Sequence, residues 1–437
     1  MPTHNHANYQ ARLDFVRNLL NERFNLGDAL EISPVQYDSE CIFKYNNFVY
    51  RVSLVSPLLS DHSDSRWNGT SQPGTVAIPK GAKDLLMRLG NRDTEGVHQE
   101  TRVENEVAIV NLVSAALGTV FRPSIVPRIY GWGSAAGESA QGWILQEFMP
   151  GIGVDLLFGK HDLEQKKALL AQMAKIIKAL QDFKLPPTIT GYGGLTFNKS
   201  GEIVSATMPT VGAGPWPTYE ASFQYRLGLA LRKADANPYI KGWHANGLRK
   251  RIDAFVERGI PAQFESLSDK DDKVVVHCDF SPTNILFNEE SGRITALIDY
   301  DFSWVSHPSY EFLRSFDGLG GQFRGWSSDE ESQEAALRDA KLHGFPASLP
   351  PKADSDSGID WEVAKAWEEV LEAEGVKRPR TIQGIDKVAD VDTILCAILP
   401  WRVTNADILA RQTEEVITEC RNDNEAHLEK LLSRLGF

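Results

Sequence analysis

The chain has 437 residues, more than one compact core of ordinary size usually holds, so we expect two lobes or domains. Hydrophobic residues make up 42% and charged residues 24%, as in ordinary globular proteins, and the net charge of −13 argues against a nucleic-acid-binding face. No apolar run reaches the roughly 18 residues that a membrane span needs, and the N-terminus lacks a signal-peptide core, so we expect no membrane partner.

The first part of the chain predicts a small sheet with two helices. Residues 9–25 show the amphipathic pattern of a helix. The pattern becomes strand-like between residues 32 and 55, and it alternates most clearly over residues 48–54. Residues 56–82 are rich in Ser, Asp, Pro and Gly, which predicts a long surface insertion. A short strand is then predicted at residues 84–89.

A second helix is predicted over residues 103–117, because apolar residues recur along it at three- and four-residue steps. Glu106 lies on this apolar stripe. A charged residue on a buried face needs a partner, so we expect a cation opposite Glu106. Strands around residues 128–131 and 143–148 then complete an N-terminal lobe of residues 1–148.

The remainder, residues 149–437, predicts a mainly helical C-terminal lobe. Its helices are expected at residues 162–183, 217–234, 243–258, 328–343, 360–374 and 402–434. Residues 345–358 are rich in Pro, Ser and Asp and predict a loop. The expected fold class is therefore α+β, with a small antiparallel sheet in the N-terminal lobe and helices in the C-terminal lobe.

One segment inside the helical part combines predicted strands with polar residues in a regular spacing. Residues 273–302 contain His277, Asp279 and Asn284 in the pattern HxDxxxxN. Three short apolar stretches predict strands, at residues 274–276, 285–287 and 294–298. Because a short turn joins the last two stretches, they should form an antiparallel hairpin.

The open end of this hairpin predicts a metal site. Asn284 precedes the first strand and Asp299 follows the second, so the two residues are expected to be neighbours. Amide and carboxylate oxygens suit Mg²⁺, which uses few protein ligands together with phosphate oxygens. Asp279 lies on the catalytic loop 277–284 that enters the same point. We therefore predict Asn284 and Asp299 as metal ligands and Asp279 as the base that accepts the proton of a substrate hydroxyl.

A metal site beside a base that accepts a hydroxyl proton suits phosphoryl transfer from a nucleotide. That reaction also needs a cation that holds the nucleotide phosphates. Arg88, on the predicted strand at 84–89, is the candidate, and Glu106 would orient it. Leu86 shares the strand face of Arg88, because side chains alternate along a strand. Leu86 is therefore expected to cover the adenine while Arg88 reaches the phosphates.

The HxDxxxxN and IDYD motifs resemble those of the aminoglycoside phosphotransferase and choline kinase superfamily. More narrowly, KYNNFVYRVSL, RVENEVAIVNL, GWILQEFMPG and HCDFSPTNIL resemble a family of fungal phosphotransferase-domain proteins, and the likeness extends from about residue 30 to 410. The resemblance implies a protein-kinase-like bilobal fold, with ATP and Mg²⁺ as cofactors and a nucleotide-binding N-terminal lobe. It maps the family's catalytic motif onto His277, Asp279 and Asn284, and its metal-binding acid onto Asp299.

Three positions depart from the family pattern. The phosphate-covering loop, near Glu40 to Asn47, has no glycine, although glycine lets backbone amides approach a phosphate closely. Asn47, at the end of that loop, is still expected to contact the nucleotide. The cation is Arg88 where kinases commonly use lysine, and arginine offers a planar fork instead of a compact ammonium. Cys278 stands where the family often has glycine.

Several other residues are expected to support the site. His277 and Glu311 would brace the catalytic loop. Glu147 and Met149 bound a hinge at which adenine would hydrogen-bond to the backbone, so their side chains need not matter. For Asp301 two interpretations stay open, a second metal ligand or a cap for the following turn.

The whole pattern predicts a small-molecule kinase that moves the γ-phosphoryl group of ATP to an alcohol. The alternative is a catalytically weak or inactive kinase-fold protein that binds a nucleotide or metabolite, and the glycine-free loop favours it. A protein kinase would need a long activation segment after Asp299, for which the sequence leaves no room. The expected partner is a hydroxyl-bearing small molecule and no nucleic acid. Four cysteines without a CxxC pair fit a reducing, cytoplasmic location, while the acceptor and the oligomeric state stay open.

Overall fold

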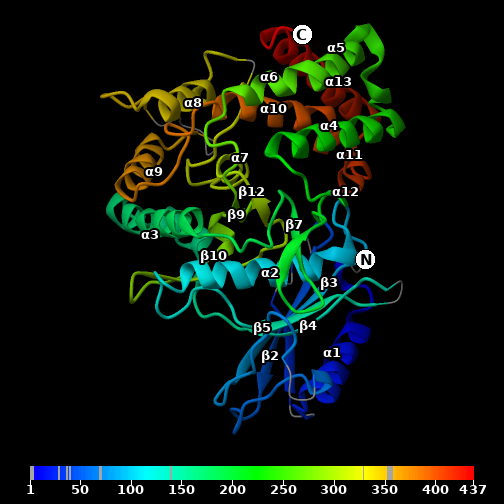
Figure 1. The fold of residues 1–437 in the computed structure, drawn as a ribbon, viewed down its shortest axis with the longest axis vertical. Coiled ribbons are helices and arrows are strands. Elements are labelled where there is room, and N and C mark those ends of the chain that lie inside the picture. The colour runs from blue at the N-terminus through cyan, green and yellow to red at the C-terminus, as the bar shows by residue number, and fades with distance from the viewer. Residues whose placement is uncertain are drawn as a thin grey trace. The chain divides into compact units, whose positions relative to one another are not determined.

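The computed structural model divides into two compact units (Figure 1). The residues that it describes are 4–27, 30–35, 38, 41–67, 71–137, 140–327, 329–351 and 358–437. The first unit comprises Met1–Ile152, Leu185–Pro215 and Ile285–Trp304, and the second comprises Gly153–Lys184, Trp216–Asn284 and Val305–Phe437. The first segment of the first unit thus ends close to the expected boundary after residue 148, and two later segments join it.

A five-stranded antiparallel sheet forms the base of the first unit, in the order β1-β2-β3-β5-β4. Its strands are β1 (Leu30–Pro34), β2 (Asn47–Leu54), β3 (Asp84–Gly90), β4 (Ile129–Gly133) and β5 (Trp143–Glu147). Side chains alternate between the two faces of a strand, and on β3 Leu85, Met87 and Leu89 are completely buried. The strands predicted at 48–54, 84–89, 128–131 and 143–148 are thereby confirmed.

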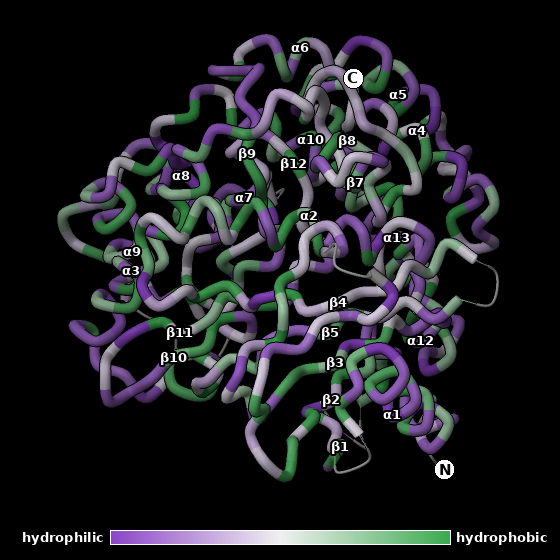
Figure 2. Tube along the Cα trace, turned by 60° about the horizontal axis from the view of Figure 1, so that its bottom comes forward, coloured by the Kyte–Doolittle hydropathy of each residue, from purple (hydrophilic) through white to green (hydrophobic). Residues whose placement is uncertain are grey.

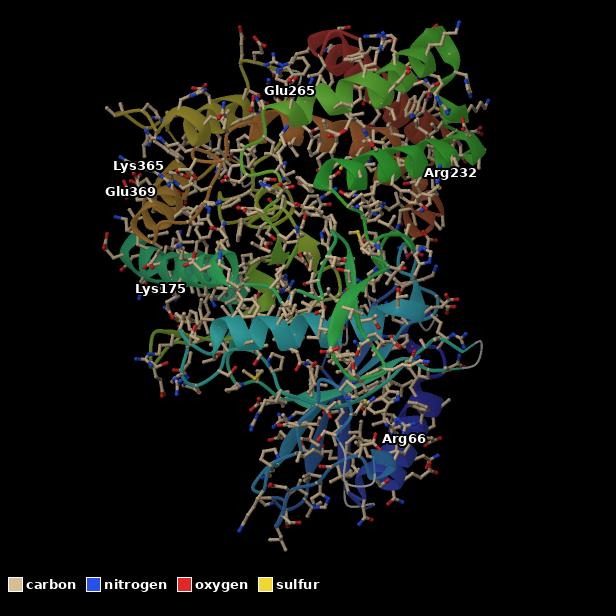
Figure 3. All side chains as sticks on the ribbon, in the orientation of Figure 1. Arg66, Lys175, Arg232, Glu265, Lys365 and Glu369 are labelled. Atoms are coloured by element: carbon tan, nitrogen blue, oxygen red, sulfur yellow. The ribbon has the colours of Figure 1, made fainter. Side chains whose placement is uncertain are left out.

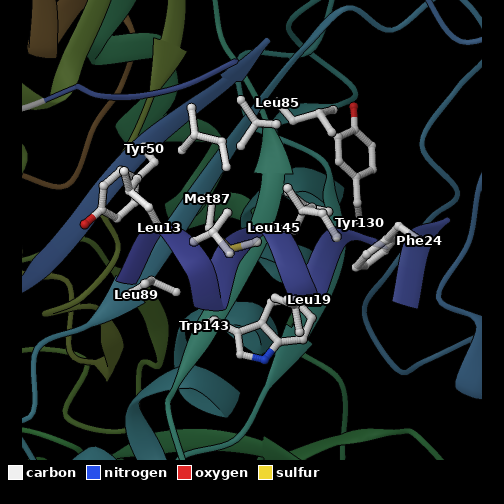
Figure 4. Close-up of a cluster of buried hydrophobic side chains, with 14 of the residues drawn as sticks. Leu13, Leu19, Phe24, Tyr50, Leu85, Met87, Leu89, Tyr130, Trp143 and Leu145 are labelled. Carbon is white, nitrogen blue, oxygen red and sulfur yellow. The ribbon is translucent and has the colours of Figure 1, made fainter. Parts of the chain in front are cut away.

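Helix α1 (Tyr9–Phe24) packs on this buried face of the sheet. Figure 4 shows Leu13, Leu19 and Phe24 of the helix beside Met87 and Leu145 of the strands. Its buried residues Leu13, Val16, Leu20 and Phe24 recur at three- and four-residue steps, and hydrophilic residues lie between them in the tube of Figure 2, so one side can be buried while the other stays in water. Each large apolar side chain buried here contributes about 1.5–3 kcal/mol.

The segment at residues 56–82 is not the pure surface insertion that its composition predicts. Ile78 is completely buried and belongs to the same hydrophobic core as α1. Asp64 is also buried and forms an ion pair with Arg23 of α1. Composition predicted a surface insertion and gave no sign that the segment contributes to the core.

Two hairpins and a long helix complete the first unit. Helix α2 (Gln99–Leu117) begins four residues before the predicted start. β7 (Gly194–Phe197) and β8 (Ile203–Ala206) form an antiparallel hairpin beside α2, where the sequence predicted no strands. β10 (Ile285–Asn288) and β11 (Arg293–Leu297) form the expected antiparallel hairpin, which is thus confirmed. The short strand β6 (Ile152–Gly153) lies at the end of the first segment.

The second unit is mainly helical, as predicted. Its longer helices are α3 (Leu163–Asp182), α4 (Tyr219–Ala236), α8 (Gln333–His343), α9 (Trp361–Ala373), α10 (Ile385–Ile398) and α13 (Glu414–Arg434). Its shorter helices are α5 (Leu248–Ala254), α6 (Ile260–Glu265), α7 (Ser309–Arg314), α11 (Trp401–Thr404) and α12 (Ala406–Leu409). A small sheet pairs β9 (Val274–Val276) with β12 (Trp304–Ser306).

Helix α10 was missed in the sequence because two acids interrupt its apolar stripe. Asp390 and Asp392 are both buried. Arg338 donates a hydrogen bond to Asp390, and Arg314 donates one to Asp392, so tertiary partners stabilise charges that the local pattern could not explain.

Two predicted helices are broken in the structure. The helix predicted at 243–258 is interrupted by the π-helical turn Phe255–Gly259, which leads into α6. The helix predicted at 402–434 is three helices, since Asn405 caps α12 and Thr413 caps α13 through their side chains. Within the described residues, every helix is either too short or too polar to cross a membrane.

Lys341 of α8 is a buried amine that makes stability depend on pH. Its side chain donates a hydrogen bond to the carbonyl oxygen of Gln322, and the residue is 3% exposed. Burial lowers the pKa of Lys341 to about 7, although Glu368 opposes the shift. In the unfolded chain the amine has its higher ordinary pKa, so between about pH 7 and pH 10 the unfolded state binds more protons. The free energy of unfolding should therefore rise with pH across this window.

Lys341→Met is expected to raise the free energy of unfolding by about 1–3 kcal/mol near pH 6.5, because it removes the buried charge, and the gain should shrink near pH 9.5. Urea denaturation at the two pH values measures this. Lys365→Met is the control, since Lys365 is an exposed amine of α9 whose Nζ lies 3.9 Å from the carboxylate of Glu369 (Figure 3). An equal loss of stability at both pH values in Lys341→Met would contradict the expected titration.

Candidate active site

A buried ion pair in the first unit joins the sheet to α2. Arg88 projects from β3 and donates a hydrogen bond to the carboxylate of Glu106 on α2. The Arg88 side chain is 7% exposed and that of Glu106 is 4% exposed. The predicted cation opposite Glu106 is therefore confirmed as an ion pair, while its part in nucleotide binding stays a prediction.

Arg88 also reaches the polypeptide that follows the β10–β11 hairpin. Its Nη2 donates to Oδ1 of Asp299 at 2.9 Å and lies 3.5 Å from Oδ2 of Asp301. Asp299 has a left-handed backbone with φ of 65°, so the chain turns sharply immediately after the hairpin. One guanidinium therefore contacts all three acids of the cluster, counting Glu106.

A second arginine, which the sequence analysis did not identify, completes the cluster. Nη2 of Arg102 donates to both carboxylate oxygens of Asp301 at 3.0 Å, and it donates to Oδ1 of Asn47 at 3.1 Å. The side-chain amide of Asn47 donates to Oδ2 of Asp301 at 2.6 Å. Arg102 lies one helical turn before Glu106 and so shares its face, but the predicted helix began at residue 103 and excluded it. For Asp301, these contacts favour a structural role over that of a second metal ligand.

The three acids differ in their access to solvent. Glu106, Asp299 and Asp301 each offer an oxygen atom within 4.8 Å of the others. The side chain of Asp299 is 40% exposed, whereas those of Glu106 and Asp301 are 4% and 1% exposed. Three carboxyl groups share two guanidiniums, so the acids outnumber the cations of the cluster. An accessible carboxylate in such a cluster suits the hard cation Mg²⁺.

The electrostatics of the cluster follow from burial and pairing. Burial opposes the charge of Arg88, but Glu106, Asp299 and Asp301 outweigh this effect and raise the pKa of Arg88. Burial raises the pKa of Glu106, against the pull of Arg88. Although burial acts to raise it, the pKa of Asp301 is lowered, because Arg102 and Arg88 stabilise the carboxylate. Asp301 is thus held as a charged, fully paired carboxylate.

The predicted catalytic loop, residues 277–284, holds Asp279 and Asn284 together. The side-chain amide of Asn284 donates to Oδ2 of Asp279 and to its carbonyl oxygen, both at 2.8 Å. Asn284 is 7% exposed, whereas Asp279 is half-buried. The predicted base therefore has access to solvent, and its carboxylate is oriented by the predicted metal ligand.

Glu311 of α7 braces this loop as the sequence analysis expected. Its two carboxylate oxygens accept hydrogen bonds from the backbone N–H groups of His277, at 2.6 Å, and Cys278, at 3.0 Å. Burial raises the pKa of Glu311, with hydrogen bonds from Ser315 and the loop opposing the shift. Cys278 has a φ of 64°, a left-handed backbone conformation that glycine adopts without strain. His277 is 1% exposed and packs its ring against Phe280, consistent with a structural role.

The remaining predicted residues lie on β3, at the end of β5 and in the segment that follows it, except Glu40. Leu86 is half-buried on β3, on the face opposite to the hydrophobic core. Glu147 ends β5, and its carboxylate accepts two hydrogen bonds from Arg128. Met149 is half-buried in the segment after β5. Glu40, in the expected phosphate-covering loop, lies outside the described residues.

The antiparallel sheet, the buried arginine–glutamate pair and the helical second unit together define a protein-kinase-like fold. The sequence matches the phosphotransferase enzyme family over residues 67–345, which is more than half of the chain. The chain therefore belongs to that family. A comparison with curated protein sequences found no match.

Solved structures support the fold. An ethanolamine kinase from Plasmodium vivax superposes with a TM-score of 0.50 at 14% identity, covering 98% of this chain and 90% of that chain. The ADP-bound aminoglycoside phosphotransferase APH(2'')-Ib gives a TM-score of 0.47 at 11% identity, covering 96% of this chain and 99% of that chain. The fold argument rests on the first of these, and at such identities neither assigns a substrate.

Proposed function

We propose that this chain is an ATP- and Mg²⁺-dependent enzyme that transfers the γ-phosphoryl group to a hydroxyl group of a small molecule. The observation that carries the proposal is the cluster around Arg88, in a member of a phosphotransferase family. It presents one accessible carboxylate, Asp299, beside a guanidinium that Glu106 holds in place. Phosphoryl transfer depends mainly on such positioning and charge neutralisation.

Each group of the chain has a distinct task in this proposal. Mg²⁺, when bound by Asp299, would neutralise negative charge on the phosphate oxygens. Arg88 holds a phosphate by its fork, and Glu106 fixes the direction of that fork. Asp279 orients the acceptor hydroxyl and accepts its proton, while the Asn284 amide and the Glu311 brace keep the carboxylate and its loop in place.

The proposal requires Asn284 and Asp299 to act on one nucleotide. The hairpin supports this requirement, because Ile285 of β10 pairs with Leu297 of β11. Asn284 directly precedes Ile285, and Asp299 follows Leu297 by two residues in the chain. The two metal-binding candidates are therefore attached to the same end of one hairpin.

The short connection after Asp299 supports a small acceptor. β12 begins at Trp304 and α7 at Ser309, so regular structure resumes almost at once. A protein kinase would place a long activation segment here to bind its polypeptide substrate. The chain has no comparable segment between Asp299 and α7, and a small hydroxyl-bearing molecule is the acceptor that fits.

Thermal denaturation with ATP, with and without Mg²⁺, tests the nucleotide part of the proposal. We expect ATP to raise the Tm clearly in the presence of Mg²⁺ and much less without it, because ligands stabilise the state that binds them. Replacement of ATP by adenosine, which has no phosphates, is the control. The absence of any Mg²⁺-dependent rise in Tm would overturn the assignment of the metal and phosphate groups.

A second candidate is a kinase-fold protein that binds nucleotide without catalysis. The glycine-free sequence from residue 41 to residue 47 favours it, because the steric reason for glycine near phosphate is unmet. An ADP-release assay over a panel of hydroxyl-bearing small molecules separates the two candidates. Stabilisation by Mg²⁺ and ATP without ADP release for any acceptor would favour the non-catalytic protein.

A further inference from the structure

The loop before β2 is fixed by side chains although it has no glycine. We call Phe43–Asn47 the 43–47 loop. The side chain of Asn5 donates to the carbonyl oxygen of Phe43 and accepts from the backbone N–H of Tyr45, both at 2.9 Å. The carbonyl oxygen of Tyr45 accepts from the side chains of Asn91, at 2.7 Å, and Thr94, at 3.1 Å. The loop is thus held from both sides.

The last part of the 43–47 loop is held by Arg102 of α2. Nη1 of Arg102 donates to the carbonyl oxygen of Asn46 at 3.1 Å, and Nη2 donates to the side chain of Asn47 at 3.1 Å. The same guanidinium binds both carboxylate oxygens of Asp301 at 3.0 Å. Arg102 and Asp301 are each 3% exposed, so water competes little with these bonds.

This arrangement links two segments that are far apart in the sequence. The 43–47 loop enters β2, and Asp301 lies two residues after Asp299, the accessible acid of the cluster. Nη2 of the guanidinium bonds to Asp301 and Asn47 while Nη1 bonds to the backbone carbonyl of Asn46, and this span needs two nitrogens held in one plane. A lysine ammonium would keep the charge but lose this geometry.

We propose that Arg102 is a positioning residue that ties the 43–47 loop to Asp301, and that this tie takes the place of glycine in presenting the loop to the phosphates of the nucleotide. The inference rests on the proposed function. It follows that loosening the tie weakens the binding of a triphosphate and leaves the binding of the base and ribose unchanged. A purely structural ion pair would not distinguish these two ligands.

The test compares two ligands on the full chain by isothermal titration calorimetry. The ligands are the non-hydrolysable ATP analogue AMP-PNP with Mg²⁺, which reaches the phosphate loop, and adenosine, which does not. Arg102→Lys is expected to weaken the binding of AMP-PNP about tenfold or more, since charge-assisted hydrogen bonds that hold the loop are lost. The Kd of adenosine should stay within about twofold.

The matched control is Arg23→Lys. Arg23 of α1 forms another buried arginine–aspartate pair in the first unit, with Asp64 as its partner. This variant should bind both ligands as the parent does. Asn5→Ala is the second test variant, because it frees the loop at Phe43 and Tyr45 without changing any charge, and it too should weaken AMP-PNP selectively. Circular dichroism verifies that each variant is folded.

The outcomes separate the inference from the proposed function. If the parent chain binds neither ligand, the proposed function is overturned and the inference falls with it. If the parent binds AMP-PNP and the folded variants Arg102→Lys and Asn5→Ala bind it equally well, the inference alone is overturned. An equal loss of affinity for AMP-PNP and adenosine would also overturn it, because the effect would then not concern the phosphates.

Discussion

Replacing Asp279 by asparagine is expected to lower kcat by about 10²–10⁴-fold while ATP still binds. The carboxylate is the group proposed to accept the proton of the acceptor hydroxyl, and an amide cannot accept it. The fold should persist, because the amide of Asn284, which donates to Oδ2 of Asp279, can donate to the carbonyl oxygen of an asparagine in the same place. The loop is also held independently, through the backbone bonds to Glu311.

The rate is measured as acceptor-dependent ADP release, with the acceptor that the panel of hydroxyl-bearing molecules identifies. Glu289→Gln is the matched control, since it makes the same chemical change at an exposed acid in the turn between β10 and β11. It should leave kcat unchanged. An Asp279→Asn variant that turns over at the rate of the parent would refute the assignment of the base.

The pattern of apolar residues in the sequence predicted those parts of the site that lie within one helix or one hairpin. Glu106 could be recognised because it lies on the apolar stripe of a helix, and the structure supplies the expected cation, Arg88. The β10–β11 hairpin could be recognised because two short apolar stretches flank one turn, and the structure pairs them. In both cases the signal is a local pattern of apolar residues, which is visible in the sequence.

Features that depend on tertiary partners could not be predicted in this way. Arg102 was missed because its partners, Asn47 and Asp301, lie in segments far away in the sequence. Asp390 interrupted the pattern of α10 because its partner, Arg338, comes from α8. A polar residue at a core position interrupts the periodic spacing of apolar residues that predicts a helix. Only the folded chain shows the partner that stabilises its buried charge.

Asp299→Asn is expected to abolish the Mg²⁺-dependent part of the rise in Tm that ATP causes, and to lower kcat by at least about 10²-fold. Asp299 is the accessible carboxylate of the cluster, at 40% exposure of its side chain, so it is the acid that a cation can meet. An amide oxygen carries no charge to bind Mg²⁺ firmly. Stability without ligand should change little, because Arg88 retains its ion pair with Glu106.

The matched variant is Asp301→Asn, two residues further along the chain. Its carboxylate is fully buried and paired, so its loss should lower the free energy of unfolding by about 3–5 kcal/mol, as removal of one partner leaves buried guanidinium charge uncompensated. Titration of Mg²⁺ at fixed ATP, followed by Tm, separates the two effects. Asp299→Asn could keep the Mg²⁺-dependent rise in Tm of the parent while a folded Asp301→Asn loses it. That result would reverse the assignment of the two acids, because the buried acid and not the exposed one would then bind the metal.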